Sequence, residues 1–518
     1  MDTPRLLRTS GTVLAVAGLL LSACTTGGTS HSAAATSAAQ SLKALPTDIP
    51  QDLRPYYEQK ISWQSCKDMP GMQCGTMKAP LDYKHPSGGT DLTLAVARKK
   101  AAGPGKRIGS LLVNPGGPGG SAIDYLQYAA FGYPSAVTAR YDMAAMDPRG
   151  VARSEPIVCL PDKQMDTFAA TDVTPDNQAE IDKLVAEDKA FAKGCQQRSG
   201  KLLEHVTTVD AARDMDIFRS LLGDAKLNYV GKSYGTFIGA TYAGLFPKRV
   251  GHLVLDGAMD PAASALESSR AQAGGFEVAF DAFAKDCVGR RDCPLGTKST
   301  ADAGRHLDAL LRSLDAKPLP TGSSRKLTEA LGASGVISAM YDQSMWPTLR
   351  TGLAKASKGD GSVLLRLSDA YYERDNKGHF SNLMYANAAV NCTDLPPALT
   401  SPEAADRAVS TFREASPHFG DNLAWSSLIC AYWPVRPIGH PQRIEARGAA
   451  PILVVGTTRD PATPYGWAKA LAEQLDSGVL LTYNGDGHTA YARGNDCIDT
   501  AVNTYLLKGT PPAHGKTC

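Results

Sequence analysis

The feature that most constrains the fold of this chain is a five-residue turn, Gly-Lys-Ser-Tyr-Gly, at residues 231–235. The turn follows an apolar run at residues 227–230 that predicts a strand, and it precedes residues 236–246, which predict a helix. A serine at such a turn forms a nucleophile elbow, in which the serine backbone is strained and the glycines leave room for neighbouring backbone. The pattern therefore predicts that Ser233 presents its hydroxyl beside a helix N-terminus, where developing negative charge is favoured.

A phosphate-binding loop is the competing interpretation, because Gly231, Lys232 and Ser233 stand in sequence. That loop requires another glycine five residues before Gly231, and Lys226 occupies the position. A chance match is the other alternative, since G-x-S-x-G occurs in many unrelated chains. The strand before the turn and the helix after it favour the elbow.

Strand-like apolar runs alternate with helical stretches around this turn. The runs occupy residues 92–96, 110–113, 141–146, 227–230, 252–255, 451–455 and 479–483, and residues 210–222 predict a helix that ends at Gly223. Continuously apolar strands joined by helices are typical of a parallel sheet covered on both faces. The run at 92–96 opens with alternating apolar and polar residues, which indicates a half-buried edge strand. With the elbow, this order predicts an α/β-hydrolase fold: a mostly parallel sheet with helices on both faces.

The alternation stops between about residues 261 and 447, where the patterns are mostly helical. We expect residues 261–447 to form a large helical cap, inserted between two sheet strands where a lid over an active site could be attached. The hydrolase core would then consist of an N-terminal part, residues 46–260, and a C-terminal part, residues 448–518.

The N-terminus has the features of a targeting segment. Two arginines precede an apolar run at residues 11–21, which is too short for a standard membrane span. The run ends in Leu-Ser-Ala-Cys, which resembles the lipobox of bacterial lipoproteins, where cleavage leaves the cysteine, here Cys24, as a lipid-bearing N-terminus. An ordinary signal peptide cut near Ala23 is the alternative. We expect a lipoprotein signal peptide over residues 1–23 and a flexible tether, rich in Ser, Thr, Ala and Gly, over residues 24–45.

The cysteines indicate export, to the outer face of the cell membrane as a lipoprotein or into the medium. Beyond Cys24 there remain ten of the 11 cysteines, and an even number in an exported chain indicates disulfides. Nearest-neighbour pairing in chain order is our expectation among several possible pairings of Cys66, Cys74, Cys159, Cys195, Cys287, Cys293, Cys392, Cys430, Cys497 and Cys518. A cysteine metal site is disfavoured, because no Cys-x-x-Cys occurs.

The charge balance argues against a nucleic-acid partner. The formal net charge is +2, so the chain has no global basic field that would recruit a phosphate backbone. We expect contact with the membrane only through the lipid anchor.

A serine hydroxyl needs a general base, and the base needs an acid that orients it. In the α/β-hydrolase fold the chain order is Ser, then Asp or Glu, then His. Asp460 ends a short loop after the run at 451–455, and Thr463 could hold its carboxylate through the hydroxyl or the amide. Helix capping is the structural alternative for Asp460. Asp256 is a rival acid, since some members of the fold place the acid one strand earlier.

Among the ten histidines, His488 has the position expected of the base. It follows the last predicted strand in Gly-Asp-Gly-His-Thr-Ala, and flexible glycines would let this loop reach across the sheet ends to Ser233. His252 begins a strand and His306 lies in the cap, which favours structural roles for both. His514 lies in the tail.

A glycine-rich run at residues 116–120 follows an early strand, where this fold places an oxyanion loop. A backbone N–H of that loop should point at the tetrahedral oxyanion, and the second donor should be the N–H of Tyr234. A simple tight turn is the alternative for the glycine run.

Together these motifs resemble one family. Pro-Gly-Gly-Pro-Gly at residues 115–119 is similar to the His-Gly-Gly-Pro-Gly loop of prolyl-aminopeptidase-like α/β hydrolases. The set Asn-Pro-Gly-Gly-Pro-Gly-Gly-Ser, Asp-Pro-Arg-Gly, Gly-Lys-Ser-Tyr-Gly, Thr-Arg-Asp-Pro-Ala-Thr-Pro and Gly-Asp-Gly-His-Thr resembles the exported tripeptidyl aminopeptidases of actinobacteria, whose mycobacterial relatives are cell-envelope serine proteases. The likeness runs from about residue 60 to the end. It implies that Gly117 is the oxyanion donor beside Tyr234. Pro115 stands where the prolyl enzymes have His, which weakens any inference of proline-specific cleavage.

Aminopeptidases of the wider family hold the free amine of the substrate with carboxylates of the cap. The resemblance therefore implies a role of this kind for one of Glu267, Glu277, Glu373 and Asp394. Asp394, which follows Cys392 closely, and Glu267 are our candidates. An ordinary solvated carboxylate is the alternative for each.

The sequence thus predicts a serine peptidase that acts on a peptide or protein through Ser233, His488 and Asp460, with no metal or organic cofactor. The resemblance implies an aminopeptidase that releases short N-terminal peptides. An esterase or lipase with the same three residues is one alternative, because ester and amide hydrolysis share the acyl-enzyme route. A non-catalytic surface binding protein on a hydrolase scaffold is the other.

Overall fold

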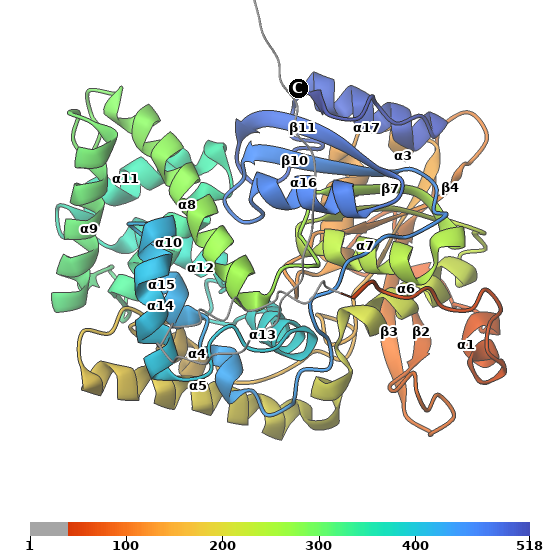
Figure 1. Ribbon diagram of the computed structural model, residues 1–518, viewed down its shortest axis with the longest axis horizontal. Helices are drawn as coiled ribbons and strands as arrows, with labels where there is room; N and C mark the ends of the chain where they lie inside the picture. Colours follow the sequence, from red (N-terminus) through yellow and green to blue (C-terminus); the bar gives the residue numbers. More distant parts are fainter. Residues whose placement is uncertain (1–39) are drawn as a thin grey trace, which may run out of the picture. The chain divides into compact units, whose positions relative to one another are not determined.

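The computed structural model describes residues 40–518, and within them a sheet of ten strands forms the centre of the protein (Figure 1). The strands lie in the order β1-β2-β3-β5-β4-β6-β7-β10-β11-β12. From β5 to β12 all neighbours are parallel, whereas β1, β2 and β3 pair in antiparallel fashion, so the expectation of a mostly parallel sheet is confirmed. The bounds are β1 (Gln64–Ser65), β2 (Gln73–Pro80), β3 (Asp91–Lys99), β4 (Gly109–Asn114), β5 (Tyr141–Met146), β6 (Leu227–Lys232), β7 (Val250–Asp256), β10 (Ile452–Arg459), β11 (Gly478–Asp486) and β12 (Lys516–Thr517).

Side chains of the parallel strands alternate between two buried faces. Leu111 and Val113 of β4 pack in one core, whereas Leu112 between them packs in the other. Because both faces are buried, the strands read as continuous apolar runs in the sequence. The first core is covered by α2 (Ala122–Gly132) and α17 (Asp496–Lys508), and the second by α6 (Thr208–Leu221), α7 (Tyr234–Leu245) and α16 (Tyr465–Gln474).

The expectation of an edge strand at residues 92–96 is wrong. These residues belong to β3, which pairs with β5 on one side and with β2 on the other. The sequence pattern led to the error because β2 contains polar and small residues and does not stand out as a strand, although it pairs with β3 from Gln73 to Pro80.

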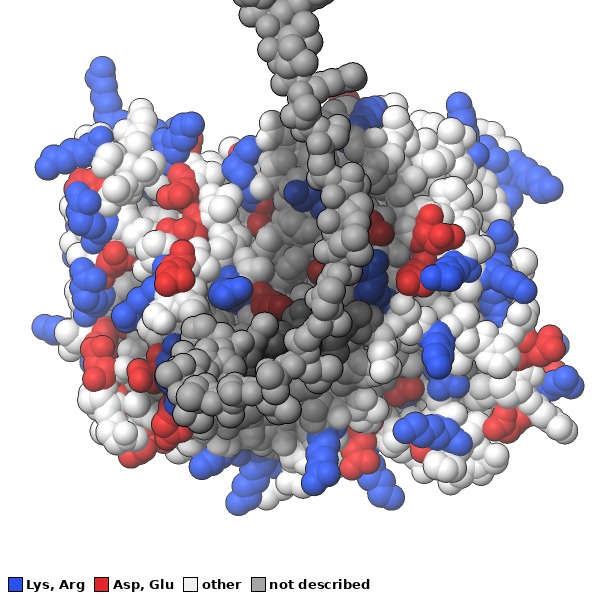
Figure 2. Space-filling view, in the orientation of Figure 1, with Lys and Arg blue, Asp and Glu red and all other residues white. Residues whose placement is uncertain are grey.

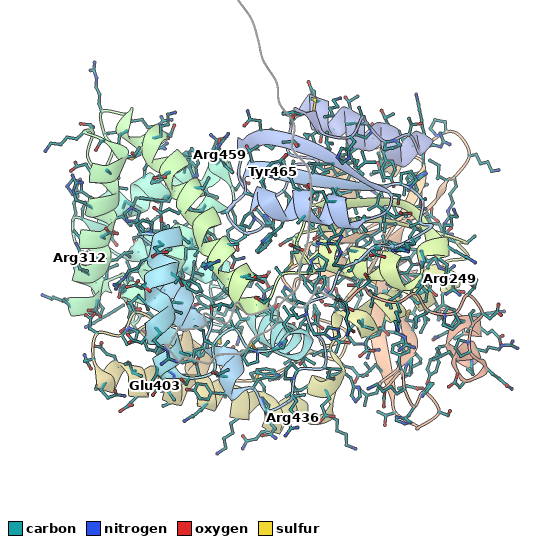
Figure 3. All side chains as sticks on the ribbon, in the orientation of Figure 1. Arg249, Arg312, Glu403, Arg436, Arg459 and Tyr465 are labelled. Atoms are coloured by element: carbon teal, nitrogen blue, oxygen red, sulfur yellow. A yellow bond between two sulfur atoms is a disulfide. The ribbon has the colours of Figure 1, made fainter. Side chains whose placement is uncertain are left out.

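The stretch from 261 to 447 is helical, as expected, and its helices lie beside the sheet on the side where the parallel strands end (Figure 1). Figure 3 marks the two sides: Arg459 is the last residue of β10, and Arg249 precedes β7 at the opposite side. The helices are α8 (Ala265–Val288), α9 (Thr300–Ala316), α10 (Glu329–Met340), α11 (Trp346–Ala356), α12 (Ser362–Tyr371), α13 (Leu383–Asp394), α14 (Pro402–Ala415) and α15 (Gly420–Ser426), with a hairpin of β8 (Leu319–Pro320) and β9 (Lys326–Leu327).

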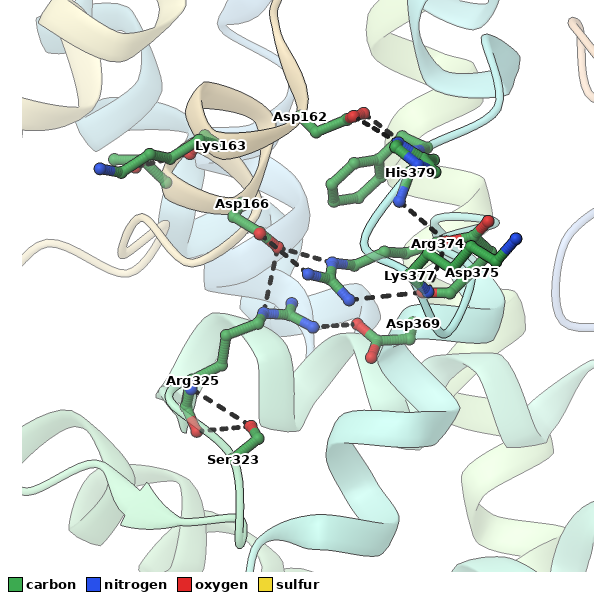
Figure 4. Close-up of polar contacts among 12 residues, drawn as sticks. Asp162, Lys163, Asp166, Ser323, Arg325, Asp369, Arg374, Asp375, Lys377 and His379 are labelled. Atoms are coloured by element: carbon green, nitrogen blue, oxygen red, sulfur yellow. Dashed lines mark hydrogen bonds and ion pairs between the residues drawn. The ribbon is translucent and has the colours of Figure 1, made fainter.

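Two helices from the N-terminal half pack with these cap helices. They are α4 (Asp162–Ala169) and α5 (Gln178–Ser199), which lie between β5 and β6 in the chain. Asp166 of α4 receives a bidentate contact from Arg374 at 2.8 and 3.0 Å and a second ion pair from Arg325 at 3.0 Å (Figure 4). Leu184 of α5 packs with Trp425 of α15. The helical layer over the strand ends is therefore assembled from two separate segments of the chain.

The targeting segment, Cys24 and most of the tether lie outside the described residues. Residues 41–45, which we assigned to the tether, run along the folded body instead. The Leu42 amide donates to the Arg443 carbonyl and the Leu45 amide to the Leu245 carbonyl, each at 2.9 Å. The folded part thus begins a few residues before Pro46.

Five disulfides join nearest neighbours in chain order, as expected: Cys66–Cys74, Cys159–Cys195, Cys287–Cys293, Cys392–Cys430 and Cys497–Cys518. Among residues 40–518, no helix combines the length and the apolar character that a membrane span requires. On the face shown in Figure 2, Lys and Arg are interspersed with Asp and Glu, in keeping with the small net charge.

Candidate active site

Ser233 stands at the turn between β6 and α7, as the sequence predicts. Its backbone has φ 55° and ψ −128°, a sparsely populated conformation that is typical of a nucleophile elbow. A Cβ on Gly231 would lie 2.4 Å from the Gly235 carbonyl oxygen, so the tight turn requires glycine there. The Ser233 amide donates to the Asp256 carbonyl at 2.9 Å, which fixes the elbow to the neighbouring strand β7.

Asp460 follows β10 directly, and its side chain is completely buried. The carboxylate accepts hydrogen bonds from the amides of Ala462 at 3.0 Å, Thr463 at 2.9 Å and Thr489 at 3.2 Å. Thr463 thus holds the Asp460 carboxylate through its amide, one of the two ways the sequence suggested. The two carboxylate oxygens of Asp460 also lie 2.8 and 3.0 Å from Nδ1 of His488. These hydrogen bonds fix the orientation of the Asp460 carboxylate.

His488 follows β11, and its ring reaches back over the strand ends. The Cβ position of Gly257, the residue after β7, is 3.2 Å from Cε1 of His488. In the sheet, β10 and β7 lie between β11 and β6. The histidine therefore reaches from the end of β11 across β10 towards β6, the strand that leads into Ser233. Among the described residues, Nε2 of His488 is buried and has no hydrogen-bond partner. With Nδ1 bound to Asp460, Nε2 is the nitrogen that remains available to accept a proton.

A cap residue supports the histidine from the other side. The His488 amide donates to the Tyr341 carbonyl at 2.9 Å, and the two rings meet edge to face with 5.5 Å between centroids. Sequence reasoning missed Tyr341, which follows α10 and lies in no motif. The hydrogen bond is made by a backbone carbonyl, which any residue could supply, and the ring contact joins residues 147 positions apart in the chain, so no local pattern marks this position.

Asp256, the rival acid, is not directed at the histidine ring. Its carboxylate accepts the amides of Ala490 at 2.9 and 3.1 Å and of Tyr491 at 3.0 Å, and it lies 3.6 Å from Nζ of Lys232. The geometry therefore favours Asp460 as the partner of His488.

The glycine run after β4 packs against the elbow. Gly116, Gly117 and Gly119 have φ of 95°, 116° and 104°. The Gly116 amide is occupied by Oδ1 of Asn114 at 2.8 Å, whereas the amides of Gly117 and Tyr234 have no partner among the described residues. An oxyanion hole requires two free N–H groups of this kind, directed at the developing negative charge.

The Asp-Pro-Arg-Gly motif after β5 is a structural element. The guanidinium of Arg149 is fully buried and pairs with Asp214 of α6 through two hydrogen bonds of 2.7 Å. It also donates to three backbone carbonyls, those of Pro80, Leu81 and His205. A buried ion pair is tolerated only when its hydrogen bonds are satisfied in this way. The motif thus fixes the loop after β5 against β2 and α6.

The carboxylates suggested for the substrate amine differ in exposure. Asp394 is buried at the end of α13, where its carboxylate accepts the amide of Thr208 at 2.9 Å and the Thr208 hydroxyl. Burial raises the pKa of Asp394 to about 7. Glu267 forms a capping box with Ser264 at the start of α8 and lines an open groove of about 580 Å³, together with Asp260, Arg270 and Trp467. Glu267 is thus the more accessible of the two.

Known proteins are similar to this chain over most of its length. A family model described as "TAP-like protein" matches residues 416–518, the part that carries Asp460 and His488. The "Tripeptidyl aminopeptidase" of Streptomyces lividans is 34% identical over 475 residues, which cover 88% of this chain and 86% of that protein. This chain belongs to the tripeptidyl-aminopeptidase-like family.

Two mycobacterial proteins extend this family. The "Serine protease Hip1" of Mycobacterium tuberculosis is 37% identical over 488 residues, covering 90% of this chain and 92% of its own. The "Carboxylesterase B" of the same species is also 37% identical, over 472 residues that cover 88% of this chain and 89% of its own. The tripeptidyl-aminopeptidase-like family therefore includes members named as peptidases and a member named as an esterase.

Proposed function

We propose that this chain is a serine peptidase with Ser233, His488 and Asp460 as its catalytic triad. The observation that carries the proposal is the Asp460–His488 pair, in which the carboxylate occupies Nδ1 and leaves the buried Nε2 without a partner. An imidazole held in this tautomer can accept the proton of the Ser233 hydroxyl at Nε2. The peptidase names of two relatives support amide bonds as the substrate.

The reaction follows from these positions. Ser233 Oγ attacks the scissile carbonyl carbon while its proton moves to Nε2 of His488, and Asp460 stabilises the imidazolium. The oxyanion accepts hydrogen bonds from the amides of Gly117 and Tyr234. Each such donor typically contributes about 2.7–4 kcal/mol to transition-state stabilisation. The tetrahedral intermediate then expels the amine, which takes the proton from Nε2. Water, activated by the same nitrogen, hydrolyses the acyl-enzyme.

We further propose aminopeptidase action that releases short N-terminal peptides. The relative named tripeptidyl aminopeptidase supports it, and a helical layer lies at the side where the parallel strands end (Figure 1). Glu267 is the candidate for holding the free amine, because it lines the open groove beside Asp260. Asp394, the other candidate, has its carboxylate inside the protein on Thr208.

Product analysis tests this proposal directly. Purified enzyme is incubated with a long peptide carrying a free N-terminus and with its N-acetylated form, and products are identified by mass spectrometry. Release of N-terminal tripeptides from the free peptide alone is expected. Internal fragments from both peptides would show endopeptidase action instead. Glu267→Gln should raise KM for the free peptide and leave the hydrolysis of a small ester unchanged.

An esterase is the second candidate, favoured by the relative named Carboxylesterase B at an identity equal to that of Hip1. Tripeptide p-nitroanilides compared with short-chain p-nitrophenyl esters decide between the two. Ester turnover without amide turnover would refute the peptidase. Labelling of the wild type by a fluorophosphonate, and its loss in Ser233→Ala, excludes a non-catalytic binding protein.

We also propose that the chain is exported and anchored by lipid on Cys24, with no other membrane contact and no nucleic-acid partner. The lipobox-like sequence and the five disulfides support this location. Cys24→Ala should move the protein from the membrane fraction of an expressing actinobacterium to the medium. Equal membrane association of the variant would contradict lipidation.

A further inference from the structure

Lys232, the residue before the nucleophile, is buried although it carries an ammonium group. Its side chain is 10% exposed, and Nζ donates to the Tyr491 carbonyl at 2.7 Å and lies 3.6 Å from Oδ2 of Asp256. Burial of a lysine costs free energy unless a partner offsets the loss of water. The proposed reaction does not use this group, so another reason must account for it.

Asp256, which lies beside Lys232, contacts both the turn at Ser233 and the segment after His488. Its backbone carbonyl accepts the Ser233 amide, and its carboxylate, which is completely buried, accepts the amides of Ala490 and Tyr491. One residue thus contacts the elbow through its main chain and the segment after His488 through its side chain. Lys232 contacts the same segment, because its ammonium group donates a hydrogen bond to the Tyr491 carbonyl.

The segment that carries the histidine needs such anchors. The histidine loop (residues 487–493) starts from β11 and must cross β10 and β7 to approach β6. Thr489 and Ala492 have φ of 66° and 60°, a conformation that side-chain-bearing residues rarely adopt. These two residues flank the pair held by Asp256, so the bonds hold the loop in a conformation that it would otherwise rarely populate.

We propose that Lys232 and Asp256 form a positioning pair that holds the histidine loop against the nucleophile elbow and so sets the relation of His488 to Ser233. The proposal rests on the proposed function. Asp256 supplies the acceptors for two loop amides, and Lys232 supplies the countercharge and the donor for the loop carbonyl. A neutral residue at 232 would leave the Asp256 carboxylate buried without a countercharge, and the loop would shift to rehydrate it.

Lys232→Met is the first test. We expect kcat for a tripeptide p-nitroanilide to fall at least tenfold while KM stays within twofold, because the substrate contacts are intact and the base is misplaced. The rate of fluorophosphonate labelling should fall by a similar factor. In Lys232→Met/Asp256→Asn no buried charge remains and the asparagine oxygen still accepts the loop amides. The double variant should therefore be more active than Lys232→Met, although it still lacks the donor to the Tyr491 carbonyl.

A matched control separates positioning from stability. Arg219 is also nearly buried and pairs at 2.8 Å with the fully buried Asp216, which Arg249 also contacts and which is not in the site. Arg219→Met should lower the unfolding temperature but leave kcat of the folded enzyme unchanged. If Lys232→Met lowers the unfolding temperature as Arg219→Met does and keeps the wild-type kcat, the pair is structural and the proposal is wrong.

Two further outcomes are decisive. A double variant that is no more active than Lys232→Met refutes the role of charge compensation. If Lys232→Met does not fold, Lys232→Gln tests the same expectation, since its amide can still donate to Tyr491, and a wild-type kcat in that variant overturns the need for the countercharge. Absence of labelling in the wild type would instead refute the proposed function, so the two failures are distinguishable.

Discussion

Replacing Gly116 by alanine should disable the site while leaving the protein folded. The added Cβ would lie 2.5 Å from the Lys232 carbonyl oxygen and 2.8 Å from the Tyr234 nitrogen, at a φ of 95°. The backbone conformation costs about 1–2 kcal/mol for an L-residue. Accommodating the overlap adds about 1–3 kcal/mol. Relief requires the glycine loop or the elbow to move, which displaces the N–H of Gly117 or of Tyr234.

The kinetic effect follows from that displacement. Loss of one oxyanion donor removes about 2.7–4 kcal/mol of transition-state stabilisation, which corresponds to a fall in kcat of about 10²–10³-fold. The assay is kcat and KM on a tripeptide p-nitroanilide, with the unfolding temperature measured on the same preparation.

Gly223→Ala is the matched control, because Gly223 has a φ of 80° and a Cβ there would meet no atom within 4 Å. Gly223→Ala should lower the free energy of unfolding by about 1–2 kcal/mol through its backbone conformation and leave kcat unchanged. A Gly116→Ala enzyme with kcat within threefold of the wild type would refute the reasoning.

Three other perturbations are informative. Asp460→Asn should lower kcat about 10⁴-fold, because an amide does not hold the imidazole in the required tautomer; a loss below tenfold in steady-state turnover would contradict the assignment. The pKa of Asp394 is raised by burial from 3.8 to about 7, so the folded state holds the proton more tightly and the free energy of unfolding falls as pH rises between these values. Asp394→Asn should remove about 3 kcal/mol of this pH dependence between pH 4.5 and 7 in urea unfolding, and an equal dependence in both proteins would argue against it. Replacing Cys392 and Cys430, which lie 38 residues apart, by serine should cost about 4 kcal/mol of stability by calorimetry and leave kcat at 25 °C within twofold.

The sheet and the three proposed catalytic positions could be predicted from local sequence. Runs such as 227–230 and 451–455 are continuously apolar because both sheet faces are buried, and each proposed catalytic residue follows a run of this kind. The order of these runs, with the chemistry of Ser233 and His488, restricts the fold to few possibilities.

Long-range partners could not be predicted in the same way. Nothing in the sequence around residues 162–169 indicates that Asp166 meets Arg325 and Arg374, which stand more than 150 residues away in the chain. Asp394 follows a cysteine in a polar segment, yet the packing of α13 turns its carboxylate onto Thr208. Such contacts depend on how helices dock, and periodicity records only that one face is apolar.

The ion pairs of Asp166 have a consequence for engineering by domain exchange. A chimaera that replaced residues 261–447 alone would delete Arg325 and Arg374 and leave Asp166 facing a foreign surface. The unit of exchange is therefore discontinuous: α4 and α5 must be transplanted with the later helices for the charges to be matched. Libraries that diversify only one of the two segments should accordingly be enriched in misassembled proteins.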